Sequence, residues 1–248
     1  MSEAGAHPGS ASPDQASVPE GFVSAVVNLV GTGPVLLGAY TIAELTAVDA
    51  VVDFLEARPS DDVLAKAVRS LAARQLLVAG SSEEQVQVRG DLGIAVTFEQ
   101  RARIVLDARV TGTGPGEPWR ILLLPHPEKI CLQFRIDALG VHEIGLYKLD
   151  EALDFLTGWL PKGPRADGSA PVDADRLLAS AERSALITVT RYTTQGSAEV
   201  AGASTDLILA RHDGRLHLLT RDPDDRAKLI PGPHDGKEIR KSVADLLT

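Results

Sequence analysis

The pattern of apolar residues predicts four β-strands between positions 103 and 149, and in the first and third of them alternate residues form one buried face. The four segments are "RIVLDARV" (103–110), "WRILLL" (119–124), "ICLQFRI" (130–136) and "HEIGLYKL" (142–149). Helical spacing of apolar residues precedes them in "DLGIAVTFEQRA" (91–102). It also follows them, where we expect Asp150 to cap a helix that ends at Pro161.

The same order of elements recurs between residues 173 and 248. The expected segments are a helix "ADRLLASAERSA" (174–185), a strand "LITVTRYTT" (186–194), a loop "QGSAEVAGA" (195–203), the strands "TDLILAR" (205–211) and "RLHLLTR" (215–221), and a helix "KEIRKSVADLL" (237–247). Each copy offers strands with one apolar face and helices to cover that face. We therefore expect an α+β fold with a mainly antiparallel sheet, covering helices and two pseudo-twofold-related halves.

Composition divides the chain at two places. Residues 1–20 are rich in Ala, Ser, Gly and Pro, and we expect a disordered tail there. Residues 162–172, "KGPRADGSAPV", have the composition of a linker. We therefore expect an N-terminal half over 21–161 and a C-terminal half over 173–248.

No charged side chain lies between Phe22 and Ala43, a length that raises the question of a membrane span. Gly31-Thr32-Gly33-Pro34 interrupts this stretch at its middle. We therefore expect two short buried elements joined by a turn, and no membrane span. The capping box of Thr41 and Glu44 then predicts a helix from about residue 42 to 57.

A second helix, capped by Ser60, leads into "LAARQLLVAGSSEEQVQV" (71–88), which predicts a helix end, a turn and a short strand. Winged-helix proteins have this order, so a DNA-associated regulator is one alternative function. However, residues 1–100 contain thirteen acidic side chains against five basic ones. DNA binding usually requires a cationic surface, and we therefore expect no nucleic acid partner.

The hairpin "LARHDGRLHLL" (209–219) is the most compact cluster of side chains that could bind a metal or take part in catalysis. If Asp213 and Gly214 form a type I′ turn, His212 and His217 share one face, while Leu207, Leu209, Leu216 and Leu218 share the other. A metal-dependent hydrolase centred on these histidines is a second alternative, although no further His or Cys pattern points to them. We expect solvated hairpin residues, with no metal and no cofactor.

The other candidate groups are isolated. His126 lies between two prolines, and His142 begins a strand, with no nucleophile or carboxylate at a diagnostic spacing. Cys131 lies on a strand, where an inert thiol is the expectation and a partly exposed, activated thiol is the alternative. As the single cysteine, it excludes an intramolecular disulfide and fits a reducing, cytoplasmic compartment. These observations favour a protein that is not an enzyme.

Several segments together resemble the EspG-type proteins of actinobacterial type VII secretion. They are "TIAELTAVDAVVDFL" (41–55), "VRSLAARQLL" (68–77), "RGDLGIAVTFEQRARIVLDARV" (89–110), "GLYKLDEALDFLTGWLP" (145–161) and "DLILARHDGRLHLLTRD" (206–222), before the final helix. The likeness extends over roughly residues 36–248. It is a likeness of element order and hydrophobic texture.

The resemblance implies a non-catalytic cytosolic chaperone that captures a helical secreted client of the PE/PPE kind, or an equivalent protein. In that family the sheet, nearby loops and C-terminal helices grip the helical tip of the client. The matching helix here is Lys237–Leu247. The matching loop consists of Thr111, Gly112, Thr113, Gly114, Pro115, Gly116, Glu117 and Pro118, with Trp119 at its exit. A second glycine-rich segment, 195–204, occupies the equivalent place in the other half.

Overall fold

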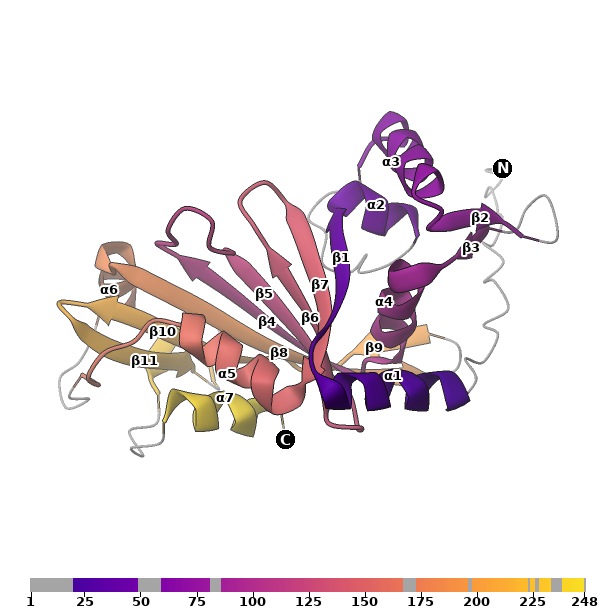
Figure 1. The fold of residues 1–248 in the computed structure, drawn as a ribbon. Coiled ribbons are helices and arrows are strands. Elements are labelled where there is room, and N and C mark those ends of the chain that lie inside the picture. Colours follow the sequence, from indigo (N-terminus) through magenta and orange to yellow (C-terminus); the bar gives the residue numbers. More distant parts are fainter. Residues whose placement is uncertain are drawn as a thin grey trace, which may run out of the picture.

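The computed structural model describes residues 20–48, 59–80, 86–166, 173–195, 198–222, 224–225, 228–232 and 238–247. Ten strands form one antiparallel sheet with helices on both of its faces (Figure 1). The expected α+β fold with a mainly antiparallel sheet is therefore confirmed.

The bounds of the elements are as follows. The helices are α1 (Glu20–Thr32), α2 (Ile42–Ala47), α3 (Asp61–Ala73), α4 (Gly90–Arg101), α5 (Leu149–Trp159), α6 (Ala174–Ser180) and α7 (Ile239–Leu246). The strands of the sheet are β1 (Val35–Thr41), β4 (Ile104–Thr111), β5 (Arg120–Pro125), β6 (Ile130–Ile136), β7 (Val141–Lys148), β8 (Arg183–Gln195), β9 (Ala198–Ala201), β10 (Thr205–His212), β11 (Arg215–Arg221) and β12 (Leu229–Pro231). A separate pair is formed by β2 (Leu77–Ala79) and β3 (Val86–Val88).

The two halves meet where β4 pairs with β8. The strand order is β1-β7-β6-β5-β4-β8-β10-β11-β12, and β9 folds back on β8. The antiparallel β4–β8 pairing extends from Ile104 opposite Arg191 to Thr111 opposite Ser184. Outward from this junction, β4, β5, β6 and β7 are matched by β8, β10, β11 and β12. An antiparallel pair has a local twofold axis, so this order gives the two halves the predicted pseudo-twofold relation.

One face of the sheet is covered by α5 from the first half and α7 from the second, which lie side by side (Figure 1). Leu156 of α5 and Val243 of α7 are fully buried in a core with Ala108 of β4 and Ile187 of β8. Arg240 of α7 donates to the carboxylates of two aspartates on α5, which fixes the two helices against each other. The joint core therefore contains residues from both halves.

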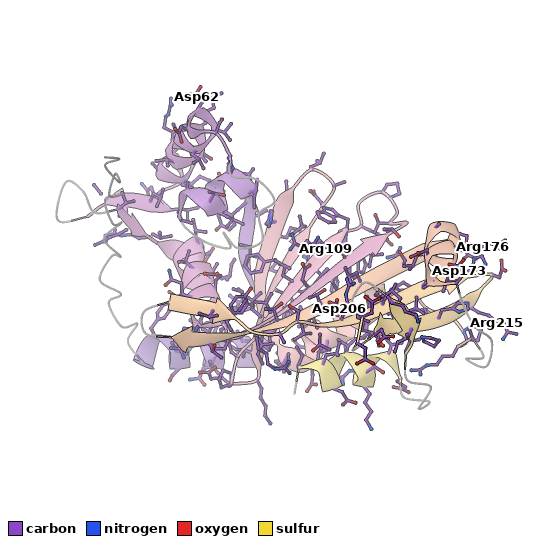
Figure 2. The ribbon with its side chains drawn as sticks, turned by 180° about the vertical axis from the view of Figure 1, so that it is seen from behind. Asp62, Arg109, Asp173, Arg176, Asp206 and Arg215 are labelled. Atoms are coloured by element: carbon purple, nitrogen blue, oxygen red, sulfur yellow. The ribbon has the colours of Figure 1, made fainter. Side chains whose placement is uncertain are left out.

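The opposite face is covered only near its two ends among the described residues. Side chains of α1, α2, α3 and α4 pack over β5, β6, β7 and β1, and Leu177 of α6 packs over β10 and β11. Figure 2 shows Arg109 and Asp206 between these regions. Asp62 lies at one side, on the helical arm formed by α2, α3 and the β2–β3 pair, and Arg176 of α6 lies at the other. The centre of this face is therefore polar.

Several predicted boundaries differ from the structure. The expected helix 174–185 ends at Ser180, because Ser184 pairs with both β4 and β10 as part of β8. Asp150 is in the first turn of α5, whose N-cap is Lys148, so its predicted capping role is wrong. The expected loop 195–203 contains β9. In each case, pairing or packing with distant residues decides the local structure.

The uncharged N-terminal stretch forms α1 and β1, joined at Gly33 as expected. The expected burial is wrong in part, because Leu29 of α1 and Leu36 of β1 are 52% and 68% exposed. No helix among the described residues is long and apolar enough to cross a membrane. The capping box of Thr41 and Glu44 starts α2, while the second half of the expected helix 42–57 lies outside the described residues. The expected tail, except Glu20, and linker residues 167–172 also lie outside them.

A buried ion pair lies beside the junction of the halves. Arg120 of β5 donates Nε and Nη2 to the two carboxylate oxygens of Asp107 on β4, both at 2.8 Å, and Arg120 is only 6% exposed. Arg109, whose side chain is 43% exposed, approaches the same carboxylate from solvent. Buried Arg120 and exposed Arg109 therefore bind the same carboxylate, that of Asp107.

We predict that Arg120→Ala lowers the free energy of unfolding by about 3 kcal/mol, because it leaves Asp107 largely buried without its main partner. Arg109→Ala is the matched control and should cost less than about 1 kcal/mol, since its pairing is screened by water. Urea denaturation followed by circular dichroism measures both values. Equal losses for the two variants would contradict the prediction.

Candidate functional site

The predicted client-binding loop follows β4 and is held in place by side chains from the second half. Arg183 of β8 donates Nη1 to Glu117 at 2.8 Å and Nη2 to the carbonyl of Trp159 at 3.0 Å. Within the loop, Glu117 also accepts from the backbone N–H of Gly114. The hydrogen bond from Arg183 is the main reason why the pKa of Glu117 lies below its usual value. The carboxylate is therefore charged at neutral pH.

The start of the loop has room for glycine alone. Gly112 has φ of +70°, and a Cβ there would lie 2.5 Å from the carbonyl oxygen of Glu182. Thr111 shares a hydrogen bond between its hydroxyl and that of Ser184. The chain thus leaves β4 in close contact with the beginning of β8, which ties the loop to the junction of the halves.

Trp119, at the loop exit, presents part of its ring to solvent. Its side chain is 37% exposed, and its indole Nε1 donates to the carbonyl of Asp137 at 2.9 Å. The carboxylate of Asp137 in turn accepts from the backbone N–H of Leu139, which is 88% exposed at the β6–β7 turn. Asp137 therefore holds the indole of Trp119 and the backbone of Leu139, two residues with exposed apolar side chains at one end of the sheet. Leu139 was not among the predicted site residues, because its segment "DALG" has only the pattern of a turn.

A second tryptophan donates a hydrogen bond to the end of the loop. Trp159, the last residue of α5, donates its indole Nε1 to the carbonyl of Pro118 at 3.1 Å. Phe155, one turn earlier on α5, is 42% exposed and lies under the guanidinium of Arg135. The end of α5 therefore contributes aromatic surface next to the loop.

The other glycine-rich segment lies at the opposite end of the β4–β8 pair. β8 ends at Gln195 beyond Arg191, which faces the beginning of β4, whereas Thr111 faces the beginning of β8. The two segments are equivalent in the repeat, and the twofold relation separates them in space. Binding at both by one helical tip would require contact across the length of the strands.

The histidine hairpin has the predicted register. His212 is opposite Arg215 and His217 is opposite Ala210, which places the two histidines on the face away from Leu216 and Leu218. Burial and the neighbouring His212 lower the pKa of His217. No group of three potential metal ligands occurs among the residues that the structure describes. The hydrolase hypothesis centred on this pair remains untested.

Two isolated candidates are buried. Cys131 is inaccessible on the face that packs against α5, and burial raises the pKa of its thiol to about 12, so the activated-thiol alternative is wrong. His142 is 5% exposed, its Nδ1 is 3.0 Å from the carbonyl oxygen of Gly140, and burial lowers its pKa. Neither side chain is available to a ligand at the surface.

His126 lies in the β5–β6 turn and is also buried. Its ring meets Phe98 edge to face at 5.2 Å, and its Nε2 has no hydrogen-bond partner in the described part of the chain. Burial lowers the pKa of His126 to about 4. The imidazole is therefore neutral at pH 7 and behaves as part of an apolar wall.

Beside this wall is a half-open pocket of about 490 Å³ that the sequence did not reveal. It lies between the beginning of β4, the β5–β6 turn, α5 and α7, with Ile104, Leu153 and Ala244 among its apolar lining residues. Four segments that are distant in the chain form it. Each of them has only the pattern of an ordinary buried element.

The helical arm forms the elements expected of a winged helix. α3 is followed by the antiparallel β2–β3 pair, with Leu77 opposite Val88. On α3, Asp61 and Asp62 are exposed in the first turn. Arg74, at its end, donates to Glu44 at 2.7 Å. The described part of this region therefore has the order of a winged helix, and the exposed basic side chains of α3 are accompanied by exposed acidic ones.

No protein-family model and no curated protein sequence matches this chain.

We predict that His126 makes the fold sensitive to acid. The unfolded state takes up a proton near the ordinary pKa of 6.5, whereas the folded state does so only near 4. Stability is therefore intact above pH 6.5 and falls progressively toward pH 4, by about 3 kcal/mol for a shift of this size. His126→Phe should remove this part of the loss.

Urea denaturation at pH 7 and at pH 4 measures the difference. Phe98→Leu is the control, because it loosens the same ring contact without removing a titratable group, and it should keep the wild-type pH dependence. An unchanged pH dependence in His126→Phe would refute the assignment.

Proposed function

We propose that this protein is a non-catalytic binding protein resembling EspG, which captures a helical protein client in the cytoplasm for type VII secretion. One observation carries the proposal: Trp119 and Leu139 are both exposed beside the predicted loop, where Asp137 accepts hydrogen bonds from the Trp119 indole and from the Leu139 backbone. Exposed apolar side chains that are held in fixed positions are typical of sites that bind another protein.

The attachment of the loop supports this proposal. Arg183 and Trp159 hold Glu117 and Pro118, so the loop loses little conformational freedom when a partner binds. Side chains that are already ordered contribute more of their buried area to affinity. A client helix would bury its apolar face on Trp119 and Leu139 and leave Glu117 at the polar rim.

The predicted client-binding helix and the predicted loop both contact α5. The described part of Lys237–Leu247 is mostly α7, which packs against α5, while Lys237 lies outside the described residues. α5 ends at Trp159 beside the loop. The loop and α7 therefore contact the same helix, as expected if they act in one binding region.

A DNA-associated regulator is the second candidate, and the order of α3 and the β2–β3 pair favours it. Lys66 and Arg69 are exposed on α3, but the exposed Asp61 and Asp62 balance their charge. A gel shift at low salt tests this function, since non-specific DNA binding is strongest there. Absence of a shift would leave the client-binding proposal as the better supported one.

We predict that tagged wild-type protein recovers a small helical protein from an actinobacterial lysate, and that Trp119→Asp loses it. The charge would have to be desolvated in the apolar contact, which should weaken binding more than about tenfold. Mass spectrometry of the bound fraction identifies the client and measures its recovery.

Leu29→Asp is the matched control, because Leu29 is 52% exposed on α1, outside the proposed binding region. It should recover the client as the wild type does. Recovery of no protein above background, or equal recovery by Trp119→Asp and wild type, would count against the proposal.

A further inference from the structure

The pocket between α5 and α7 has the properties of a site for a small ligand. Its volume of about 490 Å³ lies within the range of roughly 300–1,000 Å³ found for ligand pockets. Ile104, Leu153 and Ala244 give it apolar walls, and the neutral ring of His126 is part of the same lining. Concave apolar surface of this size is costly to leave in contact with water, and a hydrocarbon chain would cover it.

Among the residues that line the pocket, basic side chains outnumber acidic ones. Arg101, Arg103 and Arg240 line it, against Asp150 as the carboxylate among the lining residues. Arg240 is engaged with Asp150 and Asp154, which positions it between the two helices. The remaining two arginines lie at the end of α4 and the beginning of β4, next to the apolar walls.

These two arginines are accessible to an anionic group. Arg101 pairs with Glu128 at 3.4 Å, and both side chains are partly exposed, so water screens this pair and a ligand can displace it at small cost. Arg103 donates Nη1 to the carbonyls of Gln100 and Ala102, which holds its guanidinium where α4 ends. A carboxylate suits the fork of donors that a guanidinium presents.

We propose that this pocket binds a single-chain amphiphile with a carboxylate head group, with its chain between α5 and α7 and its head group beside Arg101 and Arg103. The site belongs to neither the client-binding surface nor the histidine hairpin. It requires both halves, because β4 and α5 come from the first and α7 from the second.

Isothermal titration of the full chain with hexanoate, octanoate and decanoate tests the apolar part of the proposal. Each additional buried methylene should raise affinity by about fourfold, as its transfer free energy requires. Decanol and the decylammonium ion test the head group. Decanoate should bind more tightly than either, since the arginines favour an anion.

Two variants place the ligand within the pocket. Ala244→Phe adds a ring to the pocket wall and should weaken decanoate binding about tenfold or more. Arg103→Gln removes a charge beside the head group and should weaken it about fivefold, with little effect on decanol. Their matched controls are Ala72→Phe and Arg69→Gln on α3, which should bind decanoate as the wild type does. Circular dichroism melts confirm that every variant is folded.

Three results would overturn the proposal. They are no measurable binding of decanoate by the wild type, affinity that does not change with chain length, and equal losses in the pocket variants and their controls. Decanol binding as tightly as decanoate would reject the carboxylate head group. These measurements use no protein client, so their outcome is independent of the pull-down result.

Discussion

The pairing of β4 with β8 is the constraint on which the rest of the structure depends. It joins two sets of strands into one sheet and removes the two edges that would otherwise be exposed. It also brings α5 and α7 together on one face, where Leu156 and Val243 share a core. The twofold relation of an antiparallel pair then sends the two glycine-rich segments to opposite ends of the β4–β8 pair, so they cannot form one joint site.

The pattern of the sequence predicts this architecture because each strand has a face whose apolar residues must be buried. Leu106 and Ala108 lie on either side of the polar Asp107, and both are fully buried. The turn predicted at Asp213 and Gly214 gives the register of the histidine hairpin that the structure has. Ser184 was assigned to a helix because helix-forming residues surround it, whereas its pairing with two other strands decides its conformation.

The surfaces were less predictable than the strands, since they depend on residues that are distant in the chain. The sequence predicts the role of Trp119 but not that of Leu139, because the pattern of a turn carries no information about which residues lie next to it in the fold. Asp107 and Arg109 alternate with apolar residues as a solvated face requires, yet Asp107 is largely covered by Arg120 of the next strand. Only the register of β4 and β5 reveals that contact.

β4 and α5 both connect the pocket with the proposed client-binding surface. Ile104 lines the pocket at one end of β4 and Thr111 begins the loop at the other, roughly 24 Å away at the usual rise per residue. Along α5, Leu153 lines the pocket and Trp159 holds Pro118 in the loop. Backbone hydrogen bonds to β5 and β8 hold β4 on both sides, whereas α5 is attached to the sheet through side-chain packing. If α5 moves as a rigid helix, a displacement at Leu153 also shifts Trp159 and the hydrogen bond that it donates to Pro118.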